Sequence, residues 1–389
     1  MHYDVVISGA GMVGATLACL LAKAGKQVAV LEACPPPMFN AEDDFELRVS
    51  ALSRFSQRIL EKSGAWGGVI KRRATAYEDM VVWDATGTGE IHFSAAELGE
   101  PELGHIVENK VIQLALLEAM NKEPSIDLFC PSKIHSFERN AAQVSVILDD
   151  GRELTAELLV GADGARSAVR ELAGIDWQQE DYAQKGLVCV VRTQLPHQET
   201  AWQRFMPSGP LAFLPLSDPH CSSIVWTLPA DRADVLLSQD KTQFKMALAD
   251  ALGFRLGEIE AAGPRGAFPL VGSHATHYVQ EGVALIGDAA HTIHPLAGQG
   301  VNLGIKDAAE LSDQLIAAKG GNLGGMRTLR CYERARKGDN HLTQKSMEGF
   351  RLLFGNTSQP LRLVRNSGLS LADNLPLIKN ILAHQAMGV

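Results

Sequence analysis

The sequence predicts an α/β protein: a Rossmann-like domain with an inserted antiparallel β-sheet domain and a C-terminal helical segment. Near the N-terminus, a β-branched run precedes a glycine-rich turn and a helical pattern of apolar residues, as at the start of a βαβ unit. Residues 187–228 instead hold short strand-like runs separated by loops that contain proline. A strand-like run at residues 283–288 then returns the chain to the Rossmann-like domain, and helices are expected after it.

The first βαβ unit carries a turn suited to phosphate groups. Residues 4–8 form the expected strand and residues 12–24 the expected helix. Three glycines stand at the G-x-G-x-x-G spacing: Gly9, Gly11 and Gly14. Such glycines tighten the turn and let the backbone approach a pyrophosphate, while the helix N-terminus offers free N–H groups to it. A purely structural turn is the alternative interpretation.

The second strand, at residues 27–32, favours nucleotide binding over that alternative. It ends in Glu32, 18 residues after Gly14, where a carboxylate can accept hydrogen bonds from an adenosine ribose. An acid there suits the unphosphorylated ribose of FAD or NAD and would repel the 2′-phosphate of NADP. The sequence therefore predicts a dinucleotide site.

Several elements are expected further along the chain. They are helices at residues 54–64 and 107–122, strands at residues 80–84 and 90–93, and a hairpin at residues 144–148 and 153–160. The hairpin leads into a second glycine-centred motif, Gly161-Ala-Asp163-Gly164. The β-sheet domain then has expected strands at residues 187–193, 211–216 and 223–228.

A third glycine motif completes the expected site. The strand at residues 283–288 delivers Asp288 to its carboxyl end, where a carboxylate can anchor a ribitol hydroxyl of a flavin. Residues 291–304 lead into a glycine-rich helix start, whose N–H groups would stabilise the negative charge of a reduced flavin. A plain helix cap would explain neither the Gly287-Asp288 strand end nor the order Pro-x-x-Gly-Gln-Gly-x-Asn. Together the three motifs predict an FAD site.

These elements give the expected domain organisation. We assign residues 1–75, 105–178 and 268–325 to an FAD-binding domain. Residues 76–104 and 179–267 are assigned to a β-sheet substrate domain, and residues 326–389 to a C-terminal helical region.

Composition argues against several other classes of protein. The six cysteines have neither C-x-x-C nor metal-ligand spacing, so the sequence supports no disulfide scaffold, metal site or redox-active dithiol. With a net charge of −9, we expect no nucleic-acid partner. No apolar run approaches the roughly 18 residues that a membrane-spanning helix needs, and we expect a cytoplasmic protein.

The C-terminal region carries a net positive charge, whereas the rest of the chain is acidic. From residue 326 onward it holds ten Lys/Arg against four Asp/Glu, and it carries an apolar stripe at helical spacing: Leu371, Leu375, Ile378 and Leu382. Two interpretations stay open, a helix docked on the core and a surface that rests on the anionic lipids of the inner membrane.

The whole chain resembles the group A flavoprotein aromatic hydroxylases, which share a GR2-type, p-hydroxybenzoate hydroxylase-like FAD-binding fold. Residues 294–304, His-Pro-Leu-Ala-Gly-Gln-Gly-Val-Asn-Leu-Gly, together with Asp307, resemble the signature of the ubiquinone-biosynthesis hydroxylases. Six further segments resemble the 2-polyprenylphenol hydroxylase branch: residues 48–52, 72–74, 103–109, 211–220, 223–226 and 385–388.

This resemblance implies roles for the matching positions. Arg48 would contact the FAD, Gln113 would lie against the flavin chain, and Asp163 would serve FAD positioning and transient NAD(P)H docking. The expected flavin contacts at the third motif are Gly300, Val301 and Asn302. The expected rim of the reaction site is formed by Pro295, Gly298, Gln299 and Gly300. His291 and His294 are interpreted as hydrogen-bonding spacers rather than as acids or bases.

The implied reaction is hydroxylation of the aromatic ring of a polyprenylphenol. NAD(P)H would reduce the flavin, O2 would form a flavin C4a-hydroperoxide, and its distal oxygen would pass to the phenol ring. Candidates for the wall of the substrate pocket are Phe213, Pro215 and Trp226, which could equally be sheet core. Other ubiquinone-biosynthesis proteins and a peripheral membrane surface are the expected partners.

Two other functions stay open. The same fold could serve a flavin-dependent isoprenoid reductase, which transfers hydride to a prenyl double bond, or a nucleotide-binding regulator without turnover. A flavin halogenase is disfavoured because none of the five tryptophans forms a Trp-x-Trp pair. O2 consumption stimulated by the substrate would distinguish the hydroxylase from both alternatives.

Overall fold

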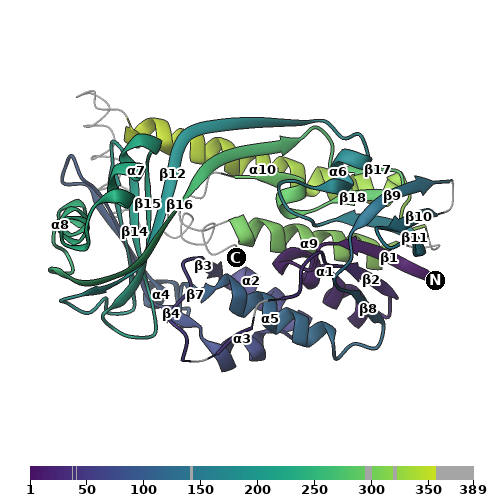
Figure 1. Ribbon diagram of the computed structural model, residues 1–389, viewed down its shortest axis with the longest axis horizontal. Coiled ribbons are helices and arrows are strands. Elements are labelled where there is room, and N and C mark those ends of the chain that lie inside the picture. Colours follow the sequence, from purple (N-terminus) through teal and green to yellow (C-terminus); the bar gives the residue numbers. More distant parts are fainter. Residues whose placement is uncertain (37, 41, 141–142, 294–299, 319–321, 356–389) are drawn as a thin grey trace.

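Two large β-sheets, one towards each end of an elongated molecule, organise the chain (Figure 1). The computed structural model describes residues 1–355 apart from 37, 41, 141–142, 294–299 and 319–321. The first sheet runs in the order β17 (Val279–Gln280), β18 (Val283–Leu285), β11 (Glu153–Gly161), β1 (His2–Ser8), β2 (Val28–Leu31) and β8 (Ile126–Phe129). The hairpin strands β9 (Ile134–Arg139) and β10 (Val144–Leu148) extend it from β11.

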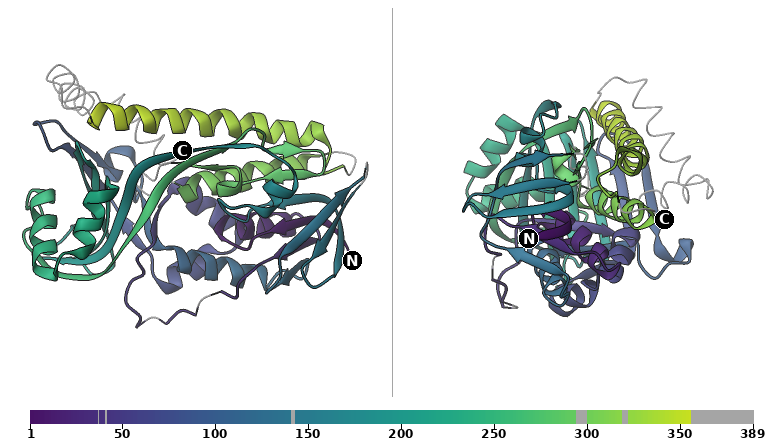
Figure 2. Two further views of the ribbon diagram at one scale, coloured as in Figure 1. Left: turned by 45° about the horizontal axis from the view of Figure 1, so that its top comes forward. Right: turned by 90° about the vertical axis from the view of Figure 1, so that its right-hand side faces the viewer.

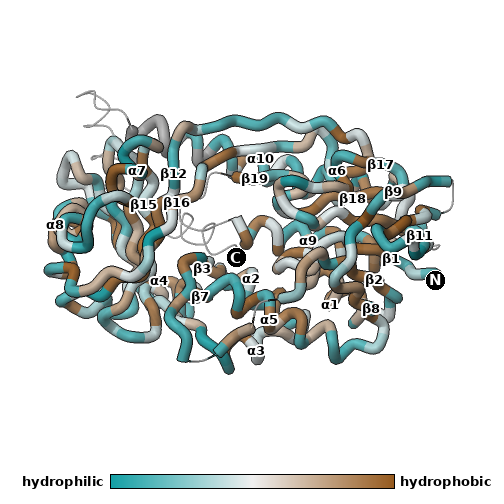
Figure 3. Tube along the Cα trace, viewed as in Figure 1, coloured by the Kyte–Doolittle hydropathy of each residue, from teal (hydrophilic) through white to brown (hydrophobic). Residues whose placement is uncertain are grey.

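The centre of this sheet is parallel and covered by helices. Strand β1 pairs in parallel with both β2 and β11, and all four residues of β2 are buried, as in sheets with both faces covered. Helix α1 (Met12–Lys23) packs against the sheet, and α5 (Asn109–Met120) and α9 (Gly300–Ala317) pack against α1. Figure 3 shows hydrophobic residues gathered along β1, β2 and α1. The α/β fold class is therefore confirmed.

The second sheet is broad and mainly antiparallel. Its order is β19 (His291–Thr292), β16 (Ile259–Ala275), β12 (Trp177–Thr193), β15 (Cys221–Pro229), β14 (Gly209–Pro215), β13 (Thr200–Met206), β5 (Asp79–Asp84) and β6 (Glu90–Ser94). One pair, β13 with β5, is parallel, because β5 enters the sheet from a distant part of the chain. The outer end of the molecule carries the helices α7 (Ala230–Ser238) and α8 (Lys241–Leu252) (Figure 1).

The two longest strands connect the two ends of the molecule. Strands β12 and β16, of 17 residues each, run side by side from the second sheet towards the first (Figures 1 and 2). The first residues of β12 are exposed and hydrophilic (Figure 3). The domain boundaries predicted at residues 178–179 and 267–268 therefore fall inside continuous strands, and the domain division itself stays a prediction.

A small antiparallel sheet lies between the two large ones. It consists of β3 (Val49–Ser53), β7 (Gly104–Glu108) and β4 (Thr75–Tyr77), and the neighbouring helices are α2 (Arg54–Ser63), α3 (Trp66–Arg72) and α4 (Ala95–Leu98). The helix predicted from residue 107 begins at Asn109 instead, because Val107 and Glu108 pair with β3 as the end of β7. The apolar pattern runs through this strand–helix junction, so the sequence does not mark the boundary.

The third glycine motif also differs in detail from its predicted form. Strand β18 ends at Leu285, and Asp288 lies in the short 3₁₀ turn Gly287–Ala289 rather than at the end of a strand. The short helix α6 (Ala168–Leu172) follows the second motif, and α10 (Met326–Gly355) packs along α9 (Figure 2). None of the described helices is both long enough and apolar enough to cross a membrane. The apolar stripe at residues 371–382 lies outside the described residues.

Candidate flavin site

The first glycine turn is closed on one side and open on the other. Gly9 has a φ of +105°, and a Cβ there would lie 2.4 Å from the carbonyl oxygen of Ala162. A Cβ on Gly14 would lie 2.0 Å from the carbonyl oxygen of Gly9, whereas one on Gly11 would meet no described atom within 4 Å. The Gly11 backbone, at the N-cap of α1, is therefore free to approach a phosphate, and the first N–H groups of α1 can bind it.

Two predicted cofactor residues meet at this turn. Glu32 accepts hydrogen bonds from the backbone N–H groups of Ala10, at 2.8 Å, and Cys34, at 3.1 Å. The side-chain amide of Gln113, on α5, lies 3.5 Å from the carbonyl oxygen of Ala10. The fold thus brings Glu32 and Gln113 to the N–H and the carbonyl oxygen of one residue, Ala10, within the turn predicted to bind the pyrophosphate.

Close contacts at α1 join the three glycine motifs. The second motif reaches the first where Ala162 meets Gly9. At the third motif, a Cβ on Gly287 would lie 3.2 Å from a methyl carbon of Val13, and one on Gly304 would lie 2.5 Å from the same carbon. Motifs far apart in the sequence therefore converge at the N-terminal turn of α1, because only glycine leaves room for these approaches.

Asp163 already has partners within the second motif. Its carboxylate accepts hydrogen bonds from the hydroxyl of Ser167 and from the backbone N–H of Val169, at 3.2 Å. It therefore shapes the turn that leads into α6, and its contact with a cofactor stays a prediction.

Asp288 and Arg48 are brought near one another, although 240 residues separate them. The Asp288 side chain is exposed, yet desolvation by the protein around it raises the pKa of its carboxyl; His291 and Arg48 act to lower that pKa. The Arg48 guanidinium lies 5.6 Å from the ring centre of Phe268, on the connecting strand β16.

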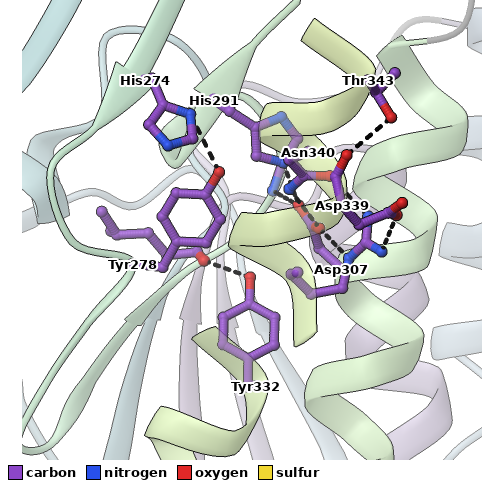
Figure 4. A network of polar contacts seen from close by, with 11 residues as sticks. His274, Tyr278, His291, Asp307, Tyr332, Asp339, Asn340 and Thr343 are labelled. Atoms are coloured by element: carbon purple, nitrogen blue, oxygen red, sulfur yellow. Dashed lines mark hydrogen bonds and ion pairs between the residues drawn. The ribbon is translucent and has the colours of Figure 1, made fainter. Parts of the chain in front are cut away.

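A buried polar network holds the turn that carries Asp288 (Figure 4). Asp307, on α9, accepts hydrogen bonds from the backbone N–H of Gly287, at 3.0 Å, and from Nε2 of His291, at 2.6 Å. It also accepts from Nε of Arg336, at 2.8 Å, and Nδ2 of Asn340, at 3.2 Å, both on α10. Burial acts to raise the pKa of Asp307, but His291 and Arg336 outweigh it and hold that pKa at about 2. His291 is therefore a buried partner of an ionised carboxylate.

The predicted residues at the start of α9 differ in how far they are accessible to a cofactor. Gly300 is exposed at the first position of the helix, and Val301 is half-buried. The Asn302 side chain is bound within the protein: it accepts hydrogen bonds from the Ser53 N–H and the Ser56 hydroxyl, and it donates to the Ala51 carbonyl. Its contact with a cofactor stays a prediction. His294, Pro295, Gly298 and Gln299 lie outside the described residues.

Comparisons with known proteins identify the family. The FAD binding domain family matches residues 2–341. The chain is 38% identical to the 3-demethoxyubiquinol 3-hydroxylase of Escherichia coli, over 99% of this chain and 98% of that one. It is 35% identical to the ubiquinone hydroxylase UbiL of Rhodospirillum rubrum, over 99% and 89% of the two chains.

The chain belongs to the FAD-dependent hydroxylases of ubiquinone biosynthesis. Solved structures support the fold of this family. PqsL of Pseudomonas aeruginosa, a probable FAD-dependent monooxygenase, has a TM-score of 0.78 at 23% identity, over 95% of this chain and all of that one. The p-nitrophenol 4-monooxygenase PnpA of Pseudomonas putida has a TM-score of 0.78 at 18% identity, over 99% and 98% of the chains.

The residues of this hydroxylase fit FAD. The open backbone at Gly11 and the N-terminus of α1 suit the pyrophosphate, and the exposed Asp288 suits a polar hydroxyl chain. Gly300, where a Cβ would meet no described atom within 4 Å, leaves the N-terminus of α9 accessible to the ring system.

The three residues predicted for the substrate wall lie on the sheet face that carries helix α8, and their contact with a substrate stays a prediction. Phe213 and Trp226 are buried in one cluster with Phe244 and Leu248 of α8, on the outer face of the second sheet. Pro215 shares that face, because it lies two residues after Phe213 on β14. These positions match the sheet-core alternative, since alternation along a strand decides the face and the sequence does not reveal which face meets the cofactor.

The face of the sheet towards the small sheet is lined by different residues. Ala212 and Leu214, which alternate with Phe213, pack in one cluster with Ile106 of β7 and with Met80 and Val225. Sequence reasoning missed this inner face, the Asp307 network and the partners of Arg48. The residues of β14 alternate between the two faces of the sheet. This alternation could have identified the inner-face residues once one face was known to be covered by helices.

Proposed function

We propose that this protein hydroxylates the aromatic ring of a polyprenylphenol, an intermediate of ubiquinone, with NAD(P)H and O2 as co-substrates. The convergence of the three glycine motifs at the N-terminal turn of α1 carries the proposal, because it gathers them into one site that suits a whole dinucleotide. The names of the E. coli and R. rubrum relatives support the substrate class.

The chain's own residues would bind and orient rather than perform redox chemistry. FAD, when bound and reduced, supplies the activation of O2. Gly11 and the N–H groups of α1 bind the pyrophosphate, Glu32 accepts hydrogen bonds from the ribose, and Asp288 binds the ribitol chain. The apolar inner face, with Ala212 and Leu214, keeps water away from this side of the second sheet.

The experiment is O2 consumption by the FAD-loaded protein with NAD(P)H, with and without a short-chain polyprenylphenol. The hydroxylase requires that the substrate stimulate O2 uptake and that the product gain one oxygen atom. Hydride transfer to the prenyl chain without O2 uptake would instead establish the reductase, and no response to substrate would favour the regulator. Asp288→Ala should weaken FAD binding and lower turnover with it.

We further propose that the protein meets its substrate at the surface of the inner membrane. The basic excess after residue 326 supports this, because a polyprenylphenol stays in the bilayer and anionic lipids attract basic segments. Sedimentation with anionic vesicles should show binding that weakens as salt increases. Binding that is equal on neutral vesicles and independent of salt would contradict an electrostatic contact.

A further inference from the structure

The loop between β2 and β3 ends at Arg48, and its backbone is fastened at that end. The Asn109 N–H donates to the carbonyl oxygen of Arg48, at 3.0 Å. The hydroxyl of Ser50 donates to the Asn109 side chain, at 2.6 Å. The first residue of α5 thus fixes the chain on which the Arg48 guanidinium reaches towards Phe268 and Asp288.

Glu108, the residue before Asn109, binds the loop at Glu46, which lies two residues before Arg48. Its side chain is only 3% exposed. Its carboxylate accepts a hydrogen bond from the Glu46 N–H, at 2.9 Å, and it pairs with Arg73 at 3.0 Å from Nε and 3.2 Å from Nη2. Burial raises the pKa of Glu108, while the Glu46 N–H and Arg73 act to lower it. A buried carboxylate of this kind needs its cation, because an unpaired buried charge is costly.

Arg73 also contacts the loop directly. Its guanidinium carbon lies 5.2 Å from the ring centre of Phe39 and 4.6 Å from that of Phe45. Its Nη1 donates to the carbonyl oxygen of Asp43, at 2.8 Å. One guanidinium therefore joins three positions of the loop to Glu108, through cation–π contacts and charge-assisted hydrogen bonds. Together, Arg73 and Glu108 form what we call the loop clasp.

We infer that the loop clasp, Arg73 with Glu108, positions Arg48 at the flavin site. This rests on the proposed contact between Arg48 and FAD. Two observations favour a positioning role for the clasp over a role in general packing. The loop is exposed at Glu42, Asp43 and Asp44. The clasp nevertheless binds the loop backbone at Asp43 and Glu46, only a few residues before Arg48. Arg73 and Glu108 are thus positioning residues, which act on the cofactor through Arg48.

The test compares five single variants and one double variant of the full chain. Arg73→Met removes the guanidinium but keeps an apolar stem, Arg73→Lys keeps the charge without the planar fork, and Glu108→Gln removes the charge of the acceptor. The matched control is Arg72→Met. Arg72 pairs with Glu118 at the edge of α5, so its loss removes an equal charge without touching the loop. The double variant is Arg48→Ala/Arg73→Met, measured beside Arg48→Ala.

Two measurements are made, neither of which needs turnover. Amide hydrogen exchange in the holoprotein reports the backbone at residues 42–48, and flavin fluorescence reports FAD affinity. Arg73→Met should speed exchange in that segment and weaken FAD binding roughly tenfold, within the couplings found between contacting residues. Glu108→Gln should act in the same direction, Arg73→Lys should recover part of the affinity, and Arg72→Met should leave both unchanged. The double variant should bind FAD no more weakly than Arg48→Ala alone.

Additive losses in the double variant would overturn the inference, because the clasp would then act independently of Arg48. Unchanged exchange at residues 42–48 in Arg73→Met and Glu108→Gln would overturn it as well, as would an Arg48→Ala variant with full FAD affinity. Since both readouts are binding properties of the protein, failure of the proposed hydroxylation would leave these results unaffected and would be recognised separately by O2 uptake.

Discussion

Replacement of Asp307 by asparagine would remove the charge at the centre of the buried network while keeping the shape of the side chain. Asp307 is fully buried and accepts hydrogen bonds from a backbone N–H and three side chains. In the variant, the Arg336 side chain, of which 8% is exposed, keeps Asp339 as its charged partner among the described residues. The turn at Gly287 would also lose its ionised acceptor.

The expected cost follows from this geometry. Removal of one partner of a buried ion pair destabilises proteins by about 3–5 kcal/mol. Asp339, which is 43% exposed, still compensates Arg336 in part, so we expect about 3 kcal/mol. Against a typical free energy of unfolding of about 5–15 kcal/mol, this is a large fraction. FAD affinity should fall too, because the turn that carries Asp288 is then less firmly held.

Urea unfolding of the apoprotein and FAD titration measure the two effects. The control is Glu348→Gln, which removes a pair with exposed Lys345 on the same helix and should cost no more than about 1 kcal/mol. Because the pKa of Asp307 is lowered from 3.8 to about 2, its stabilisation is complete above about pH 4 and is lost as the pH falls towards 2. A cost for Asp307→Asn below that of the control would refute this reasoning.

Three further predictions concern the nucleotide turn and a buried histidine. Glu32→Arg should strip FAD, seen as loss of yellow colour on purification; full occupancy would contradict the ribose assignment. Gly14→Ala should lose stability by about 1–3 kcal/mol, whereas Gly11→Ala should keep its stability and lose only FAD affinity. Burial, helped by Arg54, lowers the pKa of His105 from 6.5 to about 4. The free energy of unfolding should therefore fall by about 2 kcal/mol as the pH is lowered from about 7 to about 5. In urea unfolding, His105→Gln should abolish this pH dependence.

The sequence by itself determined the flavin site in outline. Gly9, Gly14 and Glu32 are close in the chain, and a strand–turn–helix unit brings them together through local geometry alone. The strands at 187–193, 211–216 and 223–228 were likewise predictable, because their apolar runs are bounded by turn residues. Local patterns such as these act within a few residues and need no distant partner.

Only the tertiary structure decided which residues meet across long separations. It placed Phe213 and Trp226 under α8 and left Ala212 and Leu214 on the inner face, because the face of a strand depends on what packs against it. It also joined Asp307 to Arg336 and Arg73 to Glu108. Buried charges require partners, but a sequence gives no distance between them, so these pairings arise only when the helices and the small sheet pack together.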